Sequence, residues 1–210
     1  KHAINNIKKY LGKNIKIIIM LRNPTERAYS AFQHASMGLQ EQYSFEEALI
    51  LEEGRMEKDT SLTPMVMYKE MGLYYNMVTA YKESFRNVHI IFYEDFRDDN
   101  EGEIKKIFKF LGVSLSANID FTKRYNVGGK RWRSQLMKNI FLKKYYLKSV
   151  LKKVVSKSFR KFLANIFITI STNKVINMKE KTRRKLNIFF KDDVRKLSTL
   201  LNRDLTNWMR

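Results

Sequence analysis

The feature that most constrains the fold is an apolar run that is followed almost directly by the start signals of a helix. Residues 15–21, IKIIIML, are almost all apolar and mostly β-branched, which is typical of a strand covered on both faces in a parallel sheet. Asn23 and Glu26 then fit an N-cap and a capping box, and Pro24 suits the first helical position. The sequence therefore predicts a strand–turn–helix unit, and open α/β sheets usually bind ligands at the carboxyl end of such a strand.

Helical and strand patterns alternate along the rest of the chain. Apolar spacing, cap residues and closing glycines predict helices over residues 3–10, 44–53, 65–85, 100–111 and 181–205, and a second buried strand within residues 88–96. This order indicates an α/β fold, not a sandwich or a bundle. At 210 residues with 44% hydrophobic content, the chain can bury a full core, so we expect a single domain over residues 1–210.

The charge balance favours an anionic partner. Forty-one Lys and Arg against 21 Asp and Glu leave a net charge of +20, which suits a nucleotide, nucleic acid, anionic polysaccharide or membrane surface. Residues 134–175 form a basic segment in which Lys and Arg alternate with large apolar residues, as in a basic amphipathic helix. With no Cys and only three His, we expect no metal site.

Cysteine content and hydropathy bear on the compartment. The absence of Cys fits a reducing compartment and is also compatible with export. No apolar run approaches the about 20 residues that span a bilayer. We therefore expect a cytoplasmic protein, and the basic segment leaves peripheral attachment to a membrane open.

Arg22 is the first candidate binding residue. It stands between the strand and the helix, where its guanidinium can join the free backbone N–H groups of the helix N-terminus to hold a phosphate. Ser30 lies about two turns further and can add a hydroxyl donor. The alternative is structural: Arg22 pairs with Glu26 or another carboxylate, and Ser30 is a small residue at a helix contact.

The stretch RNPTERAYS resembles the 3′-phosphate-binding motif of sulfotransferases that use 3′-phosphoadenosine 5′-phosphosulfate (PAPS). Segments similar to later parts of that family follow in the same order: YSFEEAL, MGLYYNMVTAYKESF, IIFYEDF, FLGV and RDLTNW. The resemblance implies a P-loop-NTPase-like parallel sheet flanked by helices, with the basic helical region toward the C-terminus. It also implies PAPS as co-substrate without a metal, and Arg22 and Ser30 as ligands of the 3′-phosphate.

The resemblance extends to four further residues. Tyr93 matches a tyrosine near the adenine, although an aromatic residue at a strand end is also ordinary core. The segment YNVGGKRWR is similar to a late loop that closes over the nucleotide, so Lys130 and Arg131 are expected to contact a phosphate unless the loop is merely solvated. His34 follows the binding helix on the expected acceptor side, and its alternative is a structural histidine.

The family's N-terminal strand, its loop for the 5′-phosphosulfate and its catalytic base have no counterpart here. The resemblance places them upstream of Lys1 and leaves the catalytic residues unknown. The chain is then either an N-terminally incomplete domain or a degenerate remnant, and in isolation we expect it to be inactive.

The implied reaction is transfer of a sulfuryl group from PAPS to a hydroxyl or amine, with a carbohydrate or glycolipid as the expected acceptor. The alternative is a basic protein that binds nucleic acid or an anionic membrane without catalysis. Nucleic acid is the weaker of these partners, because RRM, KH and zinc-finger signatures are absent.

Overall fold

The computed structural model describes residues 2–38, 41–58, 64–114, 119–121, 130–134, 136–137, 139, 156–174 and 177–210. The chain divides into two compact units. The first unit comprises residues 1–28, 69–126 and 180–210, and the second comprises residues 29–68 and 127–179.

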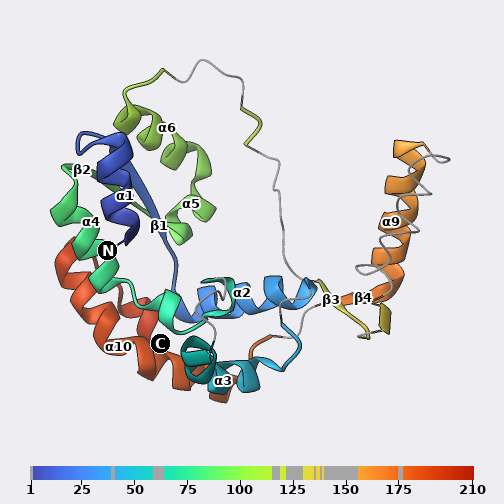
Figure 1. The fold of residues 1–210 in the computed structure, drawn as a ribbon. Helices are drawn as coiled ribbons and strands as arrows, with labels where there is room; N and C mark the ends of the chain where they lie inside the picture. Colours follow the sequence, from blue (N-terminus) through green and yellow to red (C-terminus); the bar gives the residue numbers. More distant parts are fainter. Residues whose placement is uncertain are drawn as a thin grey trace. The chain divides into compact units, whose positions relative to one another are not determined.

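A two-stranded parallel sheet organises the first unit. Strands β1 (Lys16–Leu21) and β2 (Asn87–Phe92) pair in register from Lys16↔Asn87 to Leu21↔Phe92. The helical elements around them are α1 (His2–Leu11), η2 (Glu70–Gly72), α4 (Tyr75–Ser84), α5 (Tyr93–Asp98), α6 (Asn100–Leu111), α10 (Glu180–Leu201) and η3 (Thr206–Met209) (Figure 1). The predicted α/β class is confirmed in this form, as a small parallel sheet flanked by helices.

Most predicted elements of the first unit are confirmed, and two of its helices end at glycines. Gly12 follows α1 with φ 81°, and Gly112 follows α6 with φ 71°, in the left-handed region that glycine enters without steric cost. The Gly112 N–H donates to the Lys109 carbonyl at 3.1 Å and closes that helix. Gly12 thereby leads the chain from α1 into β1, and Gly112 ends α6.

One face of β1 departs from the prediction that both faces are covered. Ile18 and Met20 are 40% and 49% exposed, whereas Leu21 on the other face is 1% exposed. Helix α6 reaches this face at the amino end of the strand, where Lys16 Nζ donates to the Leu111 carbonyl at 2.7 Å. Within the described residues the apolar run of β1 therefore exceeds what its neighbours bury.

The predicted long helix over residues 65–85 is wrong. The chain instead forms η1 (Pro64–Val66), then η2, and only then α4. Gly72 packs so closely that a Cβ there would lie 2.7 Å from the Phe190 ring. The N-terminus of α4 receives its cap from another helix, because Asp193 Oδ2 of α10 accepts from the Tyr74 N–H at 2.8 Å. Tertiary contacts thus override the local helical spacing.

Helix α10 supplies much of the core of the first unit, as its predicted periodicity required. Phe190, Val194 and Leu197 are 0% exposed, and α10 packs against α4, where Val78 is also fully buried. In Figure 1 it lies beside α4 at the bottom of the view. None of the helices in the described ranges combines the length and the apolar character needed to cross a membrane.

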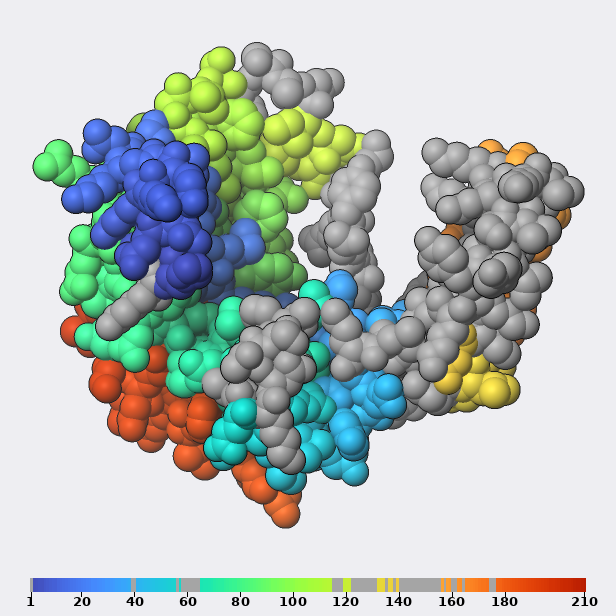
Figure 2. All heavy atoms as spheres, viewed as in Figure 1, coloured from blue at the N-terminus to red at the C-terminus, as the bar shows by residue number. Residues whose placement is uncertain are grey.

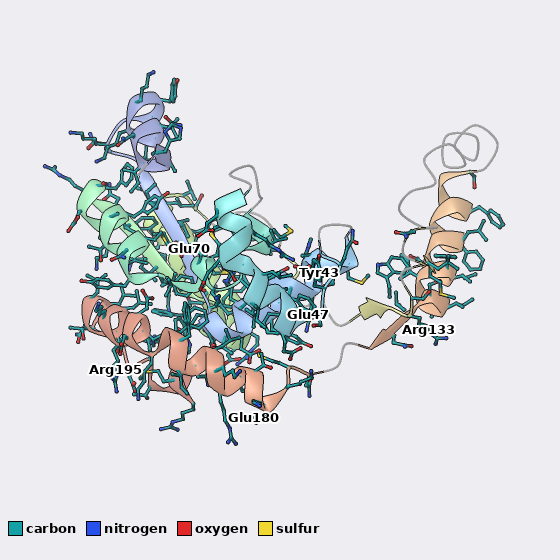
Figure 3. The ribbon with its side chains drawn as sticks, turned by 60° about the horizontal axis from the view of Figure 1, so that its bottom comes forward. Tyr43, Glu47, Glu70, Arg133, Glu180 and Arg195 are labelled. Carbon is teal, nitrogen blue, oxygen red and sulfur yellow. The ribbon has the colours of Figure 1, made fainter. Side chains whose placement is uncertain are left out.

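The second unit contains most of α2 (Pro24–Met37), which begins in the first unit, together with α3 (Phe45–Lys58). The predicted Ser44–Glu47 capping box is confirmed, since Ser44 N–H donates to Glu47 Oε2 at 2.8 Å and Glu47 N–H donates to Ser44 Oγ at 3.4 Å. Figure 3 shows Glu47 in the first turn of α3. The helix runs to Lys58, five residues beyond the predicted end.

The basic segment, residues 134–175, is only partly described. Helix α9 (Lys157–Ser171) lies within this segment, and residues 140–155 lie outside the described part. Strands β3 (Lys130–Trp132) and β4 (Thr172–Lys174) pair antiparallel, which the sequence analysis did not predict. A side-chain bond ties β3 to α2, because Trp132 Nε1 donates to the Met37 carbonyl at 2.9 Å.

Candidate functional site

The carboxyl ends of β1 and β2 bring two predicted site residues together. Leu21 and Phe92 are the last paired residues, so Arg22 and Tyr93 follow them at the same edge of the sheet. The guanidinium carbon of Arg22 lies 4.6 Å from the centroid of the Tyr93 ring, which is a cation–π distance. The parallel pairing alone accounts for this meeting of residues 71 positions apart.

The turn after Arg22 is held by side chains on both sides. Asn23 Oδ1 accepts from the N–H groups of Thr25 at 3.0 Å and Glu26 at 3.2 Å, which confirms the predicted N-cap. Glu26 does not complete the predicted capping box, because it pairs with Arg183 of α10. Glu94, in the first turn of α5, accepts from the Asn23 N–H at 3.0 Å in its place. The end of β2 thereby fixes the start of α2.

Helix α10 fixes the same turn from a second direction. Thr25 is 0% exposed, and its Oγ1 donates to Asn187 Oδ1 at 2.7 Å. Asn187 also donates through Nδ2 to the carbonyl of Arg210. The first turn of α2 is therefore anchored to both α5 and α10, which leaves Arg22 on a rigid support.

Arg22 itself has no acidic partner in the part of the chain that the structure describes. The structural alternative in which it pairs with Glu26 is wrong, because that carboxylate binds Arg183. Arg22 is half-buried and held over Tyr93, beside the N-terminus of a 14-residue helix. A guanidinium and a helix N-terminus both favour an anion.

Tyr74 belongs to the same cluster and was not predicted. It is 5% exposed, and burial raises the pKa of its hydroxyl to about 12, although Arg27 and Arg22 act in the opposite direction. The Tyr74 ring packs edge-on against Trp208 with centroids 6.4 Å apart. The hydroxyl is thus protonated at neutral pH and adds no negative charge near Arg22.

The remaining predicted site residues belong to the second unit. Ser30 is half-buried and His34 is exposed, and both lie on α2, one helical turn apart. Lys130 and Arg131 form the first two residues of β3, and their side chains lie outside the described part. The structure therefore associates Arg22 with Tyr93 and associates Ser30 with His34.

A basic hollow lies at the opposite end of the sheet. Its volume is about 580 Å³, and Lys8, Lys13, Lys82 and Arg86 are among its lining residues. Figure 2 shows α1 and α4, the two helices that end there, side by side on the face in view. Cations at helix C-termini complement the helix dipoles, which accounts for this cluster without a ligand.

The sulfotransferase domain family matches residues 4–197, and the chain belongs to this family. The chain is similar to the crystal structure of a sulfotransferase from Alicyclobacillus acidocaldarius, with 26% sequence identity and a TM-score of 0.65. That similarity covers 99% of this chain and 62% of the other, so the chain spans less than two thirds of its relative. No curated protein sequence matches the chain.

Proposed function

We propose that this chain carries the 3′-phosphate-binding part of a PAPS-dependent sulfotransferase. Arg22 is the central ligand in this proposal, and Ser30 adds a neutral donor from α2. The family match supports a transferase, and the family generally uses PAPS. The P-loop-NTPase-like character of the complete sheet is part of the same proposal.

The observation that carries the proposal is that the Arg22 guanidinium, at the sheet edge, has no ion-pair partner among the described residues. The Arg22 guanidinium lies 4.6 Å from the Tyr93 ring. Of the nearby carboxylates, Glu26 pairs with Arg183, and Glu94 accepts from the Asn23 N–H through Oε1, while its buried Oε2 has no hydrogen-bond partner among the described residues. A half-buried guanidinium beside a helix N-terminus favours an anionic ligand. The three oxygens of a phosphate monoester suit this geometry.

The other predicted ligands complete the nucleotide site in this proposal. Tyr93 contacts the adenine side, and Lys130 and Arg131 contribute charge from β3. Support for Tyr93 comes from its contact with Arg22. The guanidinium lies over one face of the Tyr93 ring, so the ring is next to the proposed phosphate ligand. Support for Lys130 and Arg131 comes from their resemblance to the family's late basic loop.

The proposed reaction divides labour between the two ends of the nucleotide. The acceptor oxygen or nitrogen forms a bond to sulfur while the bond from sulfur to the bridging oxygen of PAPS breaks, and the acceptor proton passes to a base. Arg22 and Ser30 hold the remote phosphate and do not touch sulfur. Their binding energy positions the sulfuryl group for in-line attack.

The loop for the 5′-phosphosulfate and the catalytic base lie outside residues 1–210 in this proposal. We expect the chain alone to bind the nucleotide product without catalysing transfer. The acceptor is a carbohydrate or glycolipid, and His34 faces it. Its exposure and its position one turn after Ser30 support that role.

Ligand-induced thermal stabilisation tests the proposal. We expect adenosine 3′,5′-bisphosphate to raise the Tm of the chain, and adenosine 5′-phosphate to raise it far less, because only the first supplies a 3′-phosphate. Arg22→Ala removes the difference between the nucleotides. Arg203→Ala is the matched control, since Arg203 also lies 4.6 Å from a ring, that of Phe92, but pairs with Asp95. Equal shifts by both nucleotides, or no shift by either, would overturn the proposal.

A further inference from the structure

Helix α9 exposes a row of large apolar side chains. Its members are Phe159, Phe162, Leu163, Ile166 and Ile170, each between 40% and 58% exposed. Their spacing of three and four residues places them on one side of the helix, because α-helices repeat every 3.6 residues. We call this row the α9 stripe. Figure 3 shows side chains extending outward along α9.

The carboxyl end of α9 is attached to the strands that follow and precede it in its unit. Ser171 and Thr172, at the end of the helix, are 1% and 7% exposed. The Ser171 carbonyl accepts from the Arg133 N–H at 2.8 Å, and Arg133 Nε donates to Asn173 Oδ1 at 2.9 Å. Figure 3 shows Arg133 near this end of α9. These contacts hold the carboxyl end of α9, and they involve none of the five residues of the α9 stripe.

The stripe lies within the most basic region of the chain. Residues 121–179 contain 16 Lys and Arg and no Asp or Glu, so this stretch carries most of the net charge of +20. Lys157, Arg160 and Lys161 occupy the first turns of α9 itself. An exposed apolar row, in a stretch of sequence that has many basic residues and no acidic ones, matches the chemistry of an anionic bilayer surface.

We propose that the α9 stripe docks this protein on anionic membranes, with its apolar side chains below the headgroups and the adjacent basic residues among them. Self-association through the stripe would bring two strongly positive regions together, which opposes it. Nucleic acid would engage the charge but not three aliphatic residues in the row. This inference is independent of the nucleotide site.

Vesicle co-sedimentation tests the docking surface with the full 210-residue chain. We expect binding to vesicles of phosphatidylcholine that contain about 30% of the anionic lipid phosphatidylglycerol. We expect little binding to pure phosphatidylcholine. Phe162→Ala with Ile166→Ala should weaken binding to anionic vesicles at least about tenfold, because the stripe loses two large apolar side chains. Both residues are exposed, so folding should be unaffected.

Ile188→Ala with Phe189→Ala is the matched control. These residues are also an exposed Ile and Phe, at 74% and 46%, but they lie on α10 in the acid-containing first unit. The control should bind anionic vesicles as the unsubstituted chain does. Unchanged binding by the α9 variant would assign any attraction to charge alone and overturn the proposal.

A second readout distinguishes insertion from other uses of the stripe. Phe162→Trp should gain a fluorophore that brominated lipids quench, beyond the signal of the unsubstituted chain. Dimerisation in ultracentrifugation that the α9 variant abolishes, without vesicle binding by either protein, would assign the stripe to a second copy and contradict membrane docking. Binding of an oligonucleotide but not of vesicles would contradict it as well.

Discussion

Two arginines in the described part of the chain lie against tyrosine rings, and their partners differ. Arg55 of the second unit lies 5.5 Å from the Tyr43 ring and donates to both oxygens of Glu41, at 2.7 and 3.0 Å. Arg22 of the first unit lies 4.6 Å from the Tyr93 ring and has no carboxylate in the described part of the chain. The charge of Arg55 is paired within its unit, whereas we propose that a ligand phosphate pairs with Arg22.

The surroundings of the two arginines reinforce this difference. Glu41 is 2% exposed and also accepts from the Tyr68 hydroxyl at 2.9 Å and the Tyr43 N–H at 3.1 Å, so its lone pairs are committed. Burial would raise the pKa of Glu41, but the bonds from Arg55, the Tyr43 backbone and Tyr68 outweigh it and hold the pKa below its ordinary value. The cluster around Glu41 therefore stabilises the fold of the second unit. The residues around Arg22 instead fix the position of that arginine at the end of β1.

The largest effect is expected from breaking the neutralised pair. Glu41→Gln leaves Arg55 without its charge partner in a buried site, so the free energy of unfolding should fall by about 3–5 kcal/mol. Urea denaturation measures this loss. The matched change Glu47→Gln, at an exposed cap of α3, should lower the free energy of unfolding far less, because Glu47 is fully exposed to solvent. A loss of similar size in both variants would remove the distinction between them.

The next effect is expected at Arg22 and should appear in binding rather than in folding. Arg22→Ala removes a charge-assisted contact worth about 2 to 2.8 kcal/mol, so affinity for adenosine 3′,5′-bisphosphate should fall by about 30- to 100-fold. Unfolding in urea should change by less than about 1 kcal/mol, because Arg22 has no carboxylate to abandon in the described residues. A destabilisation as large as that of Glu41→Gln would make Arg22 structural.

These predictions depend on facts that the sequence could supply only in part. The run IKIIIML and the cap at Asn23 predicted the strand, the turn and the helix start, because those signals are local. The Asn23 N–H, however, donates to Glu94, which is 71 residues away, and not to Glu26. The Tyr74 N–H at the start of α4 donates to Asp193, which is 119 residues away. Spacing along the chain carries no information on such choices.

The same limit explains the main errors. Residues 65–85 have helical spacing, but the close packing of Gly72 against Phe190 and the burial of Tyr68 divide the segment. Tyr74 falls within that predicted helix and is instead a buried neighbour of Arg22. Strands β3 and β4 lie about 40 positions apart in the sequence. They contain residues such as Lys130 and Asn173, whose types are uncommon in strands.

A smaller effect is expected from the rings beneath the two arginines. Tyr93→Leu removes the surface on which Arg22 rests, so affinity for adenosine 3′,5′-bisphosphate should fall by about three- to tenfold, in line with a cation–π contact of about 1 kcal/mol. Tyr43→Leu should leave nucleotide affinity unchanged. Calorimetry on both variants checks this, and equal losses would show that the rings do not distinguish the two sites.

The smallest effect is expected from pH near neutrality. Because the pKa of Glu41 is lowered from 4.5, its contribution to stability is complete above that value and is lost as the pH falls through the folded-state pKa. The difference in unfolding free energy between the unsubstituted chain and Glu41→Gln should therefore stay constant from about pH 7 to pH 5 and narrow at lower pH. A difference that narrows above pH 5 would show that Glu41 is not held ionised by Arg55.

The most direct test of the central claim is a calorimetric cycle that pairs one substitution with one phosphate. Dissociation constants are measured for adenosine 3′,5′-bisphosphate and adenosine 5′-phosphate, on the unsubstituted chain and on Arg22→Ala. If Arg22 holds the 3′-phosphate, the substitution should weaken the bisphosphate by about 30- to 100-fold and leave the monophosphate nearly unchanged. An equal loss for both nucleotides would show that Arg22 does not recognise the 3′-phosphate.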